Sequence, residues 1–320
     1  MQMLKLFISY KTRQKLLKNN ILTPIQTGRA ISDEVFEEML GDDTGDNISK
    51  ENERYCELTA QYWVWKNYDK IGNPEYVGFM HNRRHFIFDP KLKHMEYLWL
   101  PKTNFYFVDH IYSGYMEHFS EEKILPYIED KPDCIVYKKV DIKPITAQTN
   151  MKSHFYTGMP AQKKEVFEVL ETVMNSEFPL YKDTFNEFTN NHYMFCCNSF
   201  IMPKALFFEY SEFLFSVLAK VDEKVDSRRF NTKEKRFLGF IGEYLLSVFI
   251  IQKLKEPNFK LKELEGTFVS KDYIKFVKRL KKYKFLTKIT FGRKKKYYIK
   301  KYISYKLRLE KRGKKNNRNN

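Results

Sequence analysis

Two adjacent arginines, Arg83 and Arg84, follow a short apolar run at residues 76–80 of this 320-residue chain. The run contains only apolar residues and glycine, which is typical of a strand buried in a sheet. In open α/β sheets, ligands bind beyond the carboxyl ends of the strands. Each guanidinium can hold two phosphate oxygens, so the pair indicates an anionic ligand such as a diphosphate. A structural pairing with Asp43 or Asp46 is the alternative interpretation.

A carboxylate, Glu243, interrupts a later apolar run, and Arg236 lies seven residues before it on the same helical face. An unpaired charge in apolar surroundings is costly, so a glutamate at this position is expected to have a catalytic or a structural role. It could be a general base that takes a proton from an acceptor hydroxyl. It could equally form a salt bridge to Arg236 or Arg83. Asp109, which precedes His110, is a weaker candidate for the base.

A polar loop before the apolar run contains Asp43, Asp46 and Asn47. These side chains could bind ligand hydroxyl groups, or a metal ion if one is used. Turn and cap chemistry is the other interpretation, because Asp and Asn perform it throughout proteins. A helix is expected to begin just after this loop, near Ser49 or Asn52, both good N-cap residues.

Strands and helices alternate along the chain, which predicts an α/β fold. We expect strands at residues 5–10, 76–80, 98–109, 134–137 and 193–202. Helices are expected at residues 32–40, 112–127, 162–175, 181–190, 206–225 and 232–255. The helix at 32–40 is predicted from Ser32 as N-cap and the acids that follow it. Asn198 is a polar insertion in the predicted strand at 193–202.

Several motifs together resemble those of one family. They are Pro24–Gly28, Asp43–Ser49, Cys56–Asn67, Tyr76–Gly78 through Arg83–Phe86, Asn198–Met202, and Arg236–Phe240 with Glu243. On these residues, the stretch 4–255 resembles the bacterial capsular polysaccharide synthesis family, which are glycosyltransferases of the GT-A type. The family usually has a tyrosine at the position of Asn82, so this chain departs from its pattern there.

The resemblance implies a GT-A-like, Rossmann-type nucleotide-sugar-binding domain. Its expected activity is that of a hexosyltransferase, which moves a sugar from a nucleotide-diphosphate donor to a lipid-linked capsular or surface polysaccharide acceptor. A UDP-linked donor is expected, and a galactofuranose donor is conceivable. A nucleotide-sugar hydrolase is the near alternative, and donor turnover without an acceptor would favour it.

The resemblance also assigns roles to the candidate residues. Arg83, Arg84 and Arg236 would neutralise the donor diphosphate. Glu243 would be the base if the reaction inverts the anomeric centre, with Asp109 as the weaker candidate. The nucleotide and donor sugar would be bound by a larger polar set: Asp43, Asp46, Asn47, His81 and Asn198.

Metal dependence is not expected. GT-A enzymes commonly hold a divalent metal with an Asp-x-Asp pair, but no two aspartates here are separated by a single residue. Arginines stand where such a pair might be expected, so we infer that fixed cations replace or supplement Mg²⁺ or Mn²⁺. His81 and His85 are spaced for zinc, but the HExxH glutamate is missing. A hydrogen-bonding or stacking role beside a sugar suits them better.

The net charge of +17 is concentrated at the end of the chain. From residue 260 onward there are 23 Lys and Arg and four acids, which gives +19 there and −2 for the rest. We therefore divide the chain into a glycosyltransferase-like domain at 1–258 and a basic, mostly helical tail at 259–320. Four cysteines without CxxC spacing fit a reduced cytosol, and no apolar run is long enough to span a membrane.

The tail interleaves lysines with aromatic residues, most densely in Lys294, Lys295, Lys296, Tyr297 and Tyr298. Polybasic segments bind anionic lipid headgroups, and aromatic residues suit the membrane interface. A lipid-linked acceptor makes membrane docking the favoured interpretation, at the cytoplasmic face of the membrane. The rival from another class is a nucleic-acid-binding protein that acts through the tail.

Overall fold

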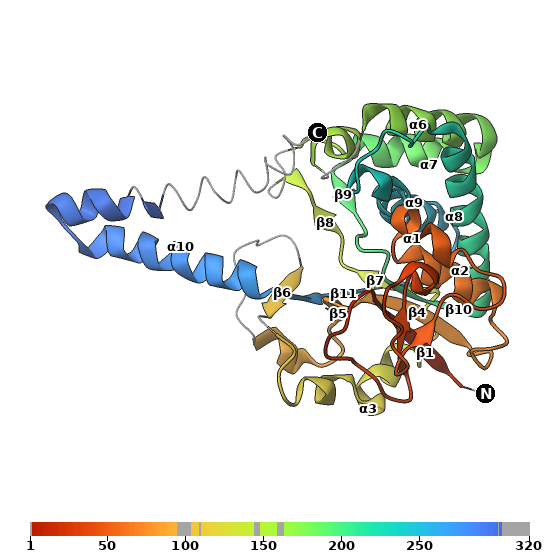
Figure 1. Cartoon of the computed structure of the whole chain (residues 1–320), viewed down its shortest axis with the longest axis horizontal. Helices are drawn as coiled ribbons and strands as arrows, with labels where there is room; N and C mark the ends of the chain where they lie inside the picture. Colours follow the sequence, from red (N-terminus) through yellow and green to blue (C-terminus); the bar gives the residue numbers. More distant parts are fainter. Residues whose placement is uncertain are drawn as a thin grey trace.

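The computed structural model describes residues 2–94, 104–108, 110–143, 148–158, 163–299 and 301–302. It shows a mixed sheet with helices on both faces, which confirms the predicted α/β class (Figure 1). The strands of this sheet follow the order β11-β7-β10-β4-β1-β2-β3, with β5, β12 and β6 branching from it. They comprise β1 (Leu4–Tyr10), β2 (Leu22–Gln26), β3 (Leu40–Gly41), β4 (Tyr76–His81), β5 (Arg84–Phe86), β6 (Phe105–Val108), β7 (Cys134–Tyr137), β10 (Phe200–Pro203), β11 (Leu261–Leu264) and β12 (Gly266–Val269).

The centre of the sheet is formed by β1 and β4, which run parallel with Leu6 opposite Gly78. Strand β2 runs parallel to β1 on its other side. All residues of β1 except Lys5 are buried, and all of β4 except His81. Strands covered on both faces need continuous apolar runs, which is why the sequence predicted β1, β4 and β7 correctly.

The helices are distributed unequally between the two faces of the sheet. In Figure 1, α1, α2, α8 and α9 lie on one face and α3 on the other, with α6 and α7 stacked further out. Helix α8 contacts both β4 and β10. The helices are α1 (Asn52–Tyr55), α2 (Leu58–Lys66), α3 (Glu121–Ile124), α5 (Met151–Ser153), α6 (Lys164–Glu177), α7 (Pro179–Asn190), α8 (Lys204–Lys224), α9 (Phe237–Lys253) and α10 (Lys271–Ile289).

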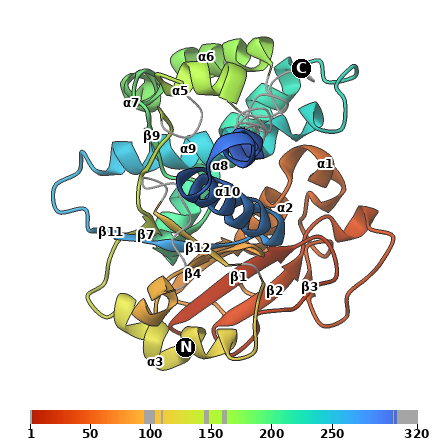
Figure 2. The ribbon, with the colours of Figure 1, turned by 90° about the vertical axis from the view of Figure 1, so that its left-hand side faces the viewer.

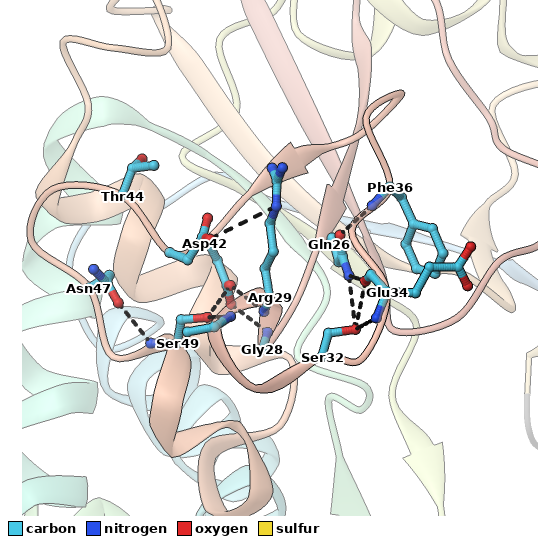
Figure 3. Close-up of polar contacts among 12 residues, drawn as sticks. Gln26, Gly28, Arg29, Ser32, Glu34, Phe36, Asp42, Thr44, Asn47 and Ser49 are labelled. Carbon is cyan, nitrogen blue, oxygen red and sulfur yellow. Dashed lines mark hydrogen bonds and ion pairs between the residues drawn. The ribbon is translucent and has the colours of Figure 1, made fainter.

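The predicted helix at residues 32–40 is wrong. The buried side chain of Gln26 organises this segment as a loop (Figure 3). Its Nε2 donates to the carbonyl of Glu34 at 2.7 Å, and its Oε1 accepts from the backbone N–H of Phe36 at 3.0 Å. Ser32 turns its hydroxyl to the Glu34 carbonyl instead of capping a helix. The side chain at the end of β2 has thus satisfied backbone groups that a helix would have used.

The helix expected from Ser49 or Asn52 is broken into two short helices. Cys56, between α1 and α2, has a positive φ of 53°. Asn52 stabilises the break, because its Nδ2 donates to the carbonyl of Cys56 at 2.6 Å and to Thr59 Oγ1 at 3.1 Å. The break places the side chain of Cys56 against Gly239, where an added Cβ would lie 2.9 Å from Cys56 Sγ.

The predicted strand at 193–202 is divided as well. Strand β9 (Tyr193–Met194) pairs with β8 (Val140–Asp141) in a separate two-stranded sheet, and only β10 enters the central sheet. Between them Cys197 and Asn198 have positive φ values of 76° and 47°. Asparagine tolerates this left-handed conformation better than most residues, and the turn directs its side chain away from the sheet ladder. The helix expected at 112–127 is likewise interrupted, with only α3 as an α-helical segment.

Residues just beyond 258 belong to the central sheet. Strand β11 pairs with β7, and β12 pairs with β5 and β6. The division of function at residue 258 stays a prediction, although the sheet extends past it. Helix α10 follows and projects from the globular part, as Figure 1 shows from the side and Figure 2 nearly end-on. Within the described residues, no helix combines the length and apolar character needed to cross a membrane.

Candidate active site

A cavity of about 550 Å³ lies at the carboxyl ends of β1 and β4. The chain passes from β1 to β2 on one side, whereas β4 returns on the other side of β1. Such a change of direction between neighbouring parallel strands is where open α/β sheets bind their ligands. The cavity is lined by Ser9, Lys11, Thr12, Gln14, Thr27, Asn52, Glu53, Cys56, Glu57, His81, Asn82, Arg83, Thr232 and Arg236.

Three cations contribute to this lining: Lys11, Arg83 and Arg236. Lys11 Nζ donates to Asn52 Oδ1 at 3.0 Å, and Arg236 Nε donates to the sulfur of Cys56 at 3.3 Å. In the described part of the chain, neither Arg83 nor Arg236 has a carboxylate within ion-pair distance. Burial lowers the pKa of Arg83, and the charges of Arg84 and Arg236 lower it further. Glu53 and Glu57 also line the cavity, so the three cations leave an excess of one positive charge, which favours an anion.

The loops beside the cavity are held by the buried carboxylate of Asp42 (Figure 3). It accepts backbone hydrogen bonds from Gly28 at 2.8 Å and Arg29 at 3.0 Å, and a third from the Ser49 hydroxyl at 2.5 Å. Gly28 has φ +66°, and an added Cβ would lie 2.5 Å from the side chain of Asn52. A glycine is therefore required for Asn52 to reach the cavity, and Asp42 fixes the turn that brings it there.

His81, at the end of β4, lines the cavity as a neutral side chain. Its pKa is held well below the usual range, chiefly by burial and then by the charges of Arg84 and Arg83. Its Nδ1 is 3.2 Å from the backbone N–H of Arg83 and accepts from it. A neutral imidazole that accepts at Nδ1 carries its proton on Nε2. His81 can therefore donate one hydrogen bond to a ligand.

Asn198 lies beside the cavity, in the lining of a much smaller space. Its Nδ2 donates to Glu57 Oε1 at 2.9 Å and to the carbonyl of Gly239 at 3.2 Å. These two bonds connect the turn before β10 to α2 and α9. A small extension of the cavity, of about 10 Å³, reaches Asn198 and Gln61 and shares Ser9, Glu57 and His81 with the main cavity.

Arg84 and Glu243 are not among the residues that line the cavity, although Glu243 interacts electrostatically with Glu57 and Arg236 of its lining. The guanidinium of Arg84 lies 4.9 Å from the ring centre of Phe268. Burial opposes its charge, but Cys197 and Glu243 outweigh that effect and raise the pKa of Arg84. Burial raises the pKa of Glu243, and Arg84 partly offsets this. The two side chains thus influence each other electrostatically, and Arg83 and Arg236 are the arginines that reach the cavity.

The polar loop has local partners. Asn47 Oδ1 accepts from the backbone N–H of Ser49, and its Nδ2 donates to the carbonyl of Gly45. Asp46 accepts from the Tyr62 hydroxyl at 3.2 Å, and Asp43 lies 3.9 Å from the guanidinium of Arg29. None of Asp43, Asp46 and Asn47 lines the cavity, so their role in donor binding stays a prediction.

Two further candidates are placed elsewhere. Asp109 lies outside the described residues. His85 is fully buried, with its Nδ1 2.9 Å from the Tyr115 hydroxyl, and burial lowers its pKa to about 3. Among the described residues, no group of three His, Cys, Asp or Glu side chains is arranged to hold a metal ion. The donors present therefore do not form a metal cage by themselves.

Sequence reasoning missed Asn52, Glu57 and Gln61 as site residues, and it favoured a solvated Lys11 over one that contacts phosphate. Lys11 had a detectable signal, because it directly follows the first predicted strand, at the carboxyl end where ligands bind. Asn52 was assigned only a capping role. Glu57 and Gln61 carried no signal, because Gln61 is buried only in the folded chain, where α2 packs against α8, and Glu57 is the residue that precedes α2.

Comparison with known proteins places the chain in a family. It belongs to the family described as a domain of unknown function, DUF4422, whose model matches residues 5–254. That range nearly equals the stretch on which the resemblance to capsular polysaccharide synthesis enzymes rests, although the description of the family names no activity. No curated protein matches the chain.

A solved structure is similar to this chain. It is the apo structure of the WbbM bifunctional glycosyltransferase, with a TM-score of 0.75 and 33% sequence identity. The match covers 84% of this chain and 46% of that one, so this chain spans less than half the length of that protein. The similar protein is a glycosyltransferase, and the predicted resemblance to glycosyltransferases is to that extent confirmed.

Proposed function

We propose that this protein transfers a sugar from a nucleotide-diphosphate donor to a glycan acceptor. The observation that carries the proposal is the cluster of Lys11, Arg83 and Arg236 in a cavity at the carboxyl ends of β1 and β4. The two arginines have no carboxylate partner among the described residues, so their charge is available to a ligand. The similarity to a glycosyltransferase structure supports this choice among anionic ligands.

The cations suit the chemistry of the leaving group. When the bond from the sugar to the nucleotide breaks, negative charge develops on the diphosphate, and fixed cations stabilise it without reorganising. Arg83 and Arg236 are placed to form charge-assisted hydrogen bonds with phosphate oxygens. We assign Arg84 a supporting role, because it lies against Phe268 and influences Glu243.

Glu243 is the proposed base for an inverting reaction. A carboxylate whose pKa is raised toward the working pH is a better proton acceptor than an ordinary glutamate. Burial produces such a shift here, and Arg84 limits it. The acceptor hydroxyl would lose its proton to this group as it attacks the sugar. Asp109 remains the second candidate.

The finer assignment follows the family resemblance. We propose a GT-A-type hexosyltransferase that uses a UDP-linked donor, with galactofuranose as one possible sugar, and a lipid-linked capsular or surface polysaccharide as acceptor. Fixed cations would replace or supplement Mg²⁺ or Mn²⁺. Glycan assembly on a lipid carrier would take place at the cytoplasmic face of the membrane.

The end of the described chain supports membrane association. After α10, residues 292–299 form a second helical segment that turns back, with the rings of Tyr283 and Tyr298 6.4 Å apart. Large apolar side chains are exposed around the turn, with Phe291 83% exposed and Ile289 52%. Lys294, Lys295 and Lys296 are exposed beside them. An apolar tip flanked by lysines suits the interface of an anionic bilayer.

A thermal-shift screen tests the proposed function. The full chain would be heated with UDP, UDP-glucose, UDP-galactose, UDP-galactofuranose and UDP-N-acetylglucosamine, with uridine as the control that lacks phosphate. A ligand that binds only the folded state raises the melting temperature. We expect UDP and at least one nucleotide sugar to raise it and uridine to leave it unchanged. No shift with any phosphate-bearing ligand would contradict the proposal.

A further inference from the structure

The small extension of the cavity contains two buried polar atoms without partners. Among the described residues, Nε2 of Gln61 and Oδ1 of Asn198 have no hydrogen-bond partner, although Gln61 is 2% and Asn198 4% exposed. Buried polar groups in folded proteins are almost always hydrogen-bonded, so each exception requires an explanation. Both residues line the same extension, which opens beside Ser9, Glu57 and His81 of the main cavity.

The two atoms have complementary chemistry. The amide nitrogen of Gln61 can only donate a hydrogen bond, and the amide oxygen of Asn198 can only accept one. The orientation of Asn198 is set by the two acceptors of its Nδ2, Glu57 Oε1 and the Gly239 carbonyl. A hydroxyl group both accepts and donates, so one hydroxyl could satisfy both side chains at once.

The size of the extension limits what can occupy it. Its volume of about 10 Å³ is close to that of a single water-sized probe, and far smaller than the 550 Å³ of the main cavity. A phosphate, a base or a whole sugar ring is too large. One hydroxyl that projects from a sugar in the main cavity fits both the space and the polarity.

The backbone around the extension is specialised to keep it open. Asn198 adopts a left-handed conformation with φ 47°. Gly242 of α9 faces it, and an added Cβ there would lie 3.3 Å from Asn198 Oδ1 and 2.7 Å from Leu58 Cδ1. A side chain at position 242 would therefore press on Asn198 and α2.

We propose that Gln61 and Asn198 form a subsite for one hydroxyl of the donor sugar and thereby select the donor. The inference rests on the proposed function, because it assumes a nucleotide sugar in the main cavity. A site built to hydrogen-bond a hydroxyl discriminates strongly against an analogue without it, because the polar groups of the site are then left unpaired.

Calorimetric titration of wild type and Gln61→Met tests the subsite. The substitution keeps the length of the side chain and removes the donor. UDP lacks the sugar that is transferred, so the Kd of UDP for Gln61→Met should stay within about twofold of its Kd for wild type. The Kd of the nucleotide sugar identified by the thermal-shift screen should rise by about tenfold, because the hydroxyl loses a buried partner. Gln2→Met, at a side chain that bonds only to the Asn20 carbonyl, is the matched control and should change neither value.

Deoxy analogues identify the hydroxyl. A nucleotide sugar that lacks the bound hydroxyl should bind wild type and Gln61→Met equally, whereas analogues deoxygenated elsewhere should keep the difference. Gln61→Leu, which removes the amide without adding a charge, serves if Gln61→Met unfolds before binding is measured. It should weaken the nucleotide sugar and leave UDP unaffected in the same way.

The outcomes separate the two proposals. If wild type binds neither UDP nor any nucleotide sugar, the proposed function fails and the subsite fails with it. If wild type binds a nucleotide sugar and Gln61→Met binds it equally well, the extension holds only water and the subsite alone is wrong. A loss of UDP and nucleotide-sugar affinity by the same factor also overturns the subsite, because the effect is then not confined to the sugar.

Discussion

Asn198 donates a hydrogen bond from Nδ2 to Oε1 of Glu57 at 2.9 Å, across 141 residues of sequence. The bond joins the left-handed turn before β10 to the residue that precedes α2, and both residues line the cavity region. It connects α2 and β10, which are both packed in the core, beside the cavity. We therefore expect substitutions of the exposed lining arginines to leave the fold intact.

Arg83→Ala and Arg236→Ala should each weaken UDP binding by about tenfold or more, because a hydrogen bond to a charged group contributes about 1.5–3 kcal/mol. Their thermal stability without ligand should match that of wild type. Titration calorimetry measures the affinity. Arg228→Ala is the matched control, since its side chain is 88% exposed and, among the described residues, pairs with Asp226 alone. Unchanged affinity in both cavity variants would remove the basis for a diphosphate site.

Glu243→Gln should abolish sugar transfer while nucleotide-sugar binding is retained, because the amide cannot take a proton from the acceptor. In wild type the rate should fall as the pH falls through the raised pKa of Glu243. Product formation measured across pH tests both statements. Normal turnover by Glu243→Gln would exclude it as the base and leave Asp109 as the candidate to examine.

The difference in stability between Glu243→Gln and wild type should depend on pH in a defined direction. Burial raises the pKa of Glu243 in the folded state above its unfolded value. The folded state therefore binds the proton more tightly, and the stability this provides is present below the unfolded pKa and lost as the pH rises through the folded pKa. The melting temperature of the glutamine variant relative to wild type should increase with pH over this range. A difference in melting temperature that does not change with pH would mean that folding does not shift the pKa of Glu243.

Arg84→Ala should abolish turnover near neutral pH without unfolding the protein. Arg84 lowers the pKa of Glu243, so its removal should raise that pKa further and keep the carboxyl protonated. Some activity should return as the pH is raised. Measuring turnover against pH separates this effect from a direct contact between Arg84 and the diphosphate. Loss of such a contact would also weaken UDP binding. Near-normal activity at neutral pH would reject any role for Arg84.

Replacement of Lys294, Lys295 and Lys296 by glutamate should weaken binding to vesicles containing phosphatidylglycerol by about a hundredfold or more, since each lysine contributes about 1 kcal/mol at an anionic surface. Neutral phosphatidylcholine vesicles should bind wild type weakly. Co-sedimentation of the full chain measures both. The matched control replaces three exposed lysines of the globular part by glutamate: Lys50, Lys91 and Lys182.

The same variants address the rival function. If wild type ignores anionic vesicles, binds single-stranded RNA tightly through these lysines and binds no nucleotide sugar, the protein is a nucleic-acid-binding protein. Loss of vesicle binding alone, with the thermal shift by nucleotide sugar retained, is the result expected for a transferase that docks on a membrane.

Turnover should survive treatment with EDTA, because the cations that line the cavity can stabilise the leaving diphosphate without a metal ion. Transfer rates before and after chelation, with Mg²⁺ or Mn²⁺ added back, measure this. Complete loss with EDTA and recovery with either metal would show that the arginines supplement a metal and do not replace it.

The sequence by itself determined the parts of the fold that depend on local patterns. Continuous apolar runs identified β1, β4 and β7, and apolar helix faces identified α6 and α9, because burial imposes those patterns on strands and helices directly. The order of these elements and the adjacent arginines were enough to predict an anion site after β4.

Only the tertiary structure decided which residues form that site. Arg83 reaches the cavity and its neighbour Arg84 does not, because Arg83 lies in the turn between β4 and β5 whereas Arg84 begins β5 and lies against Phe268. Gln61 gained its significance only when the turn at Asn198 left a donor and an acceptor without partners in the same space. Local propensity acts over a few residues, whereas a cavity is built from segments far apart in the chain, and their meeting depends on how the whole core packs.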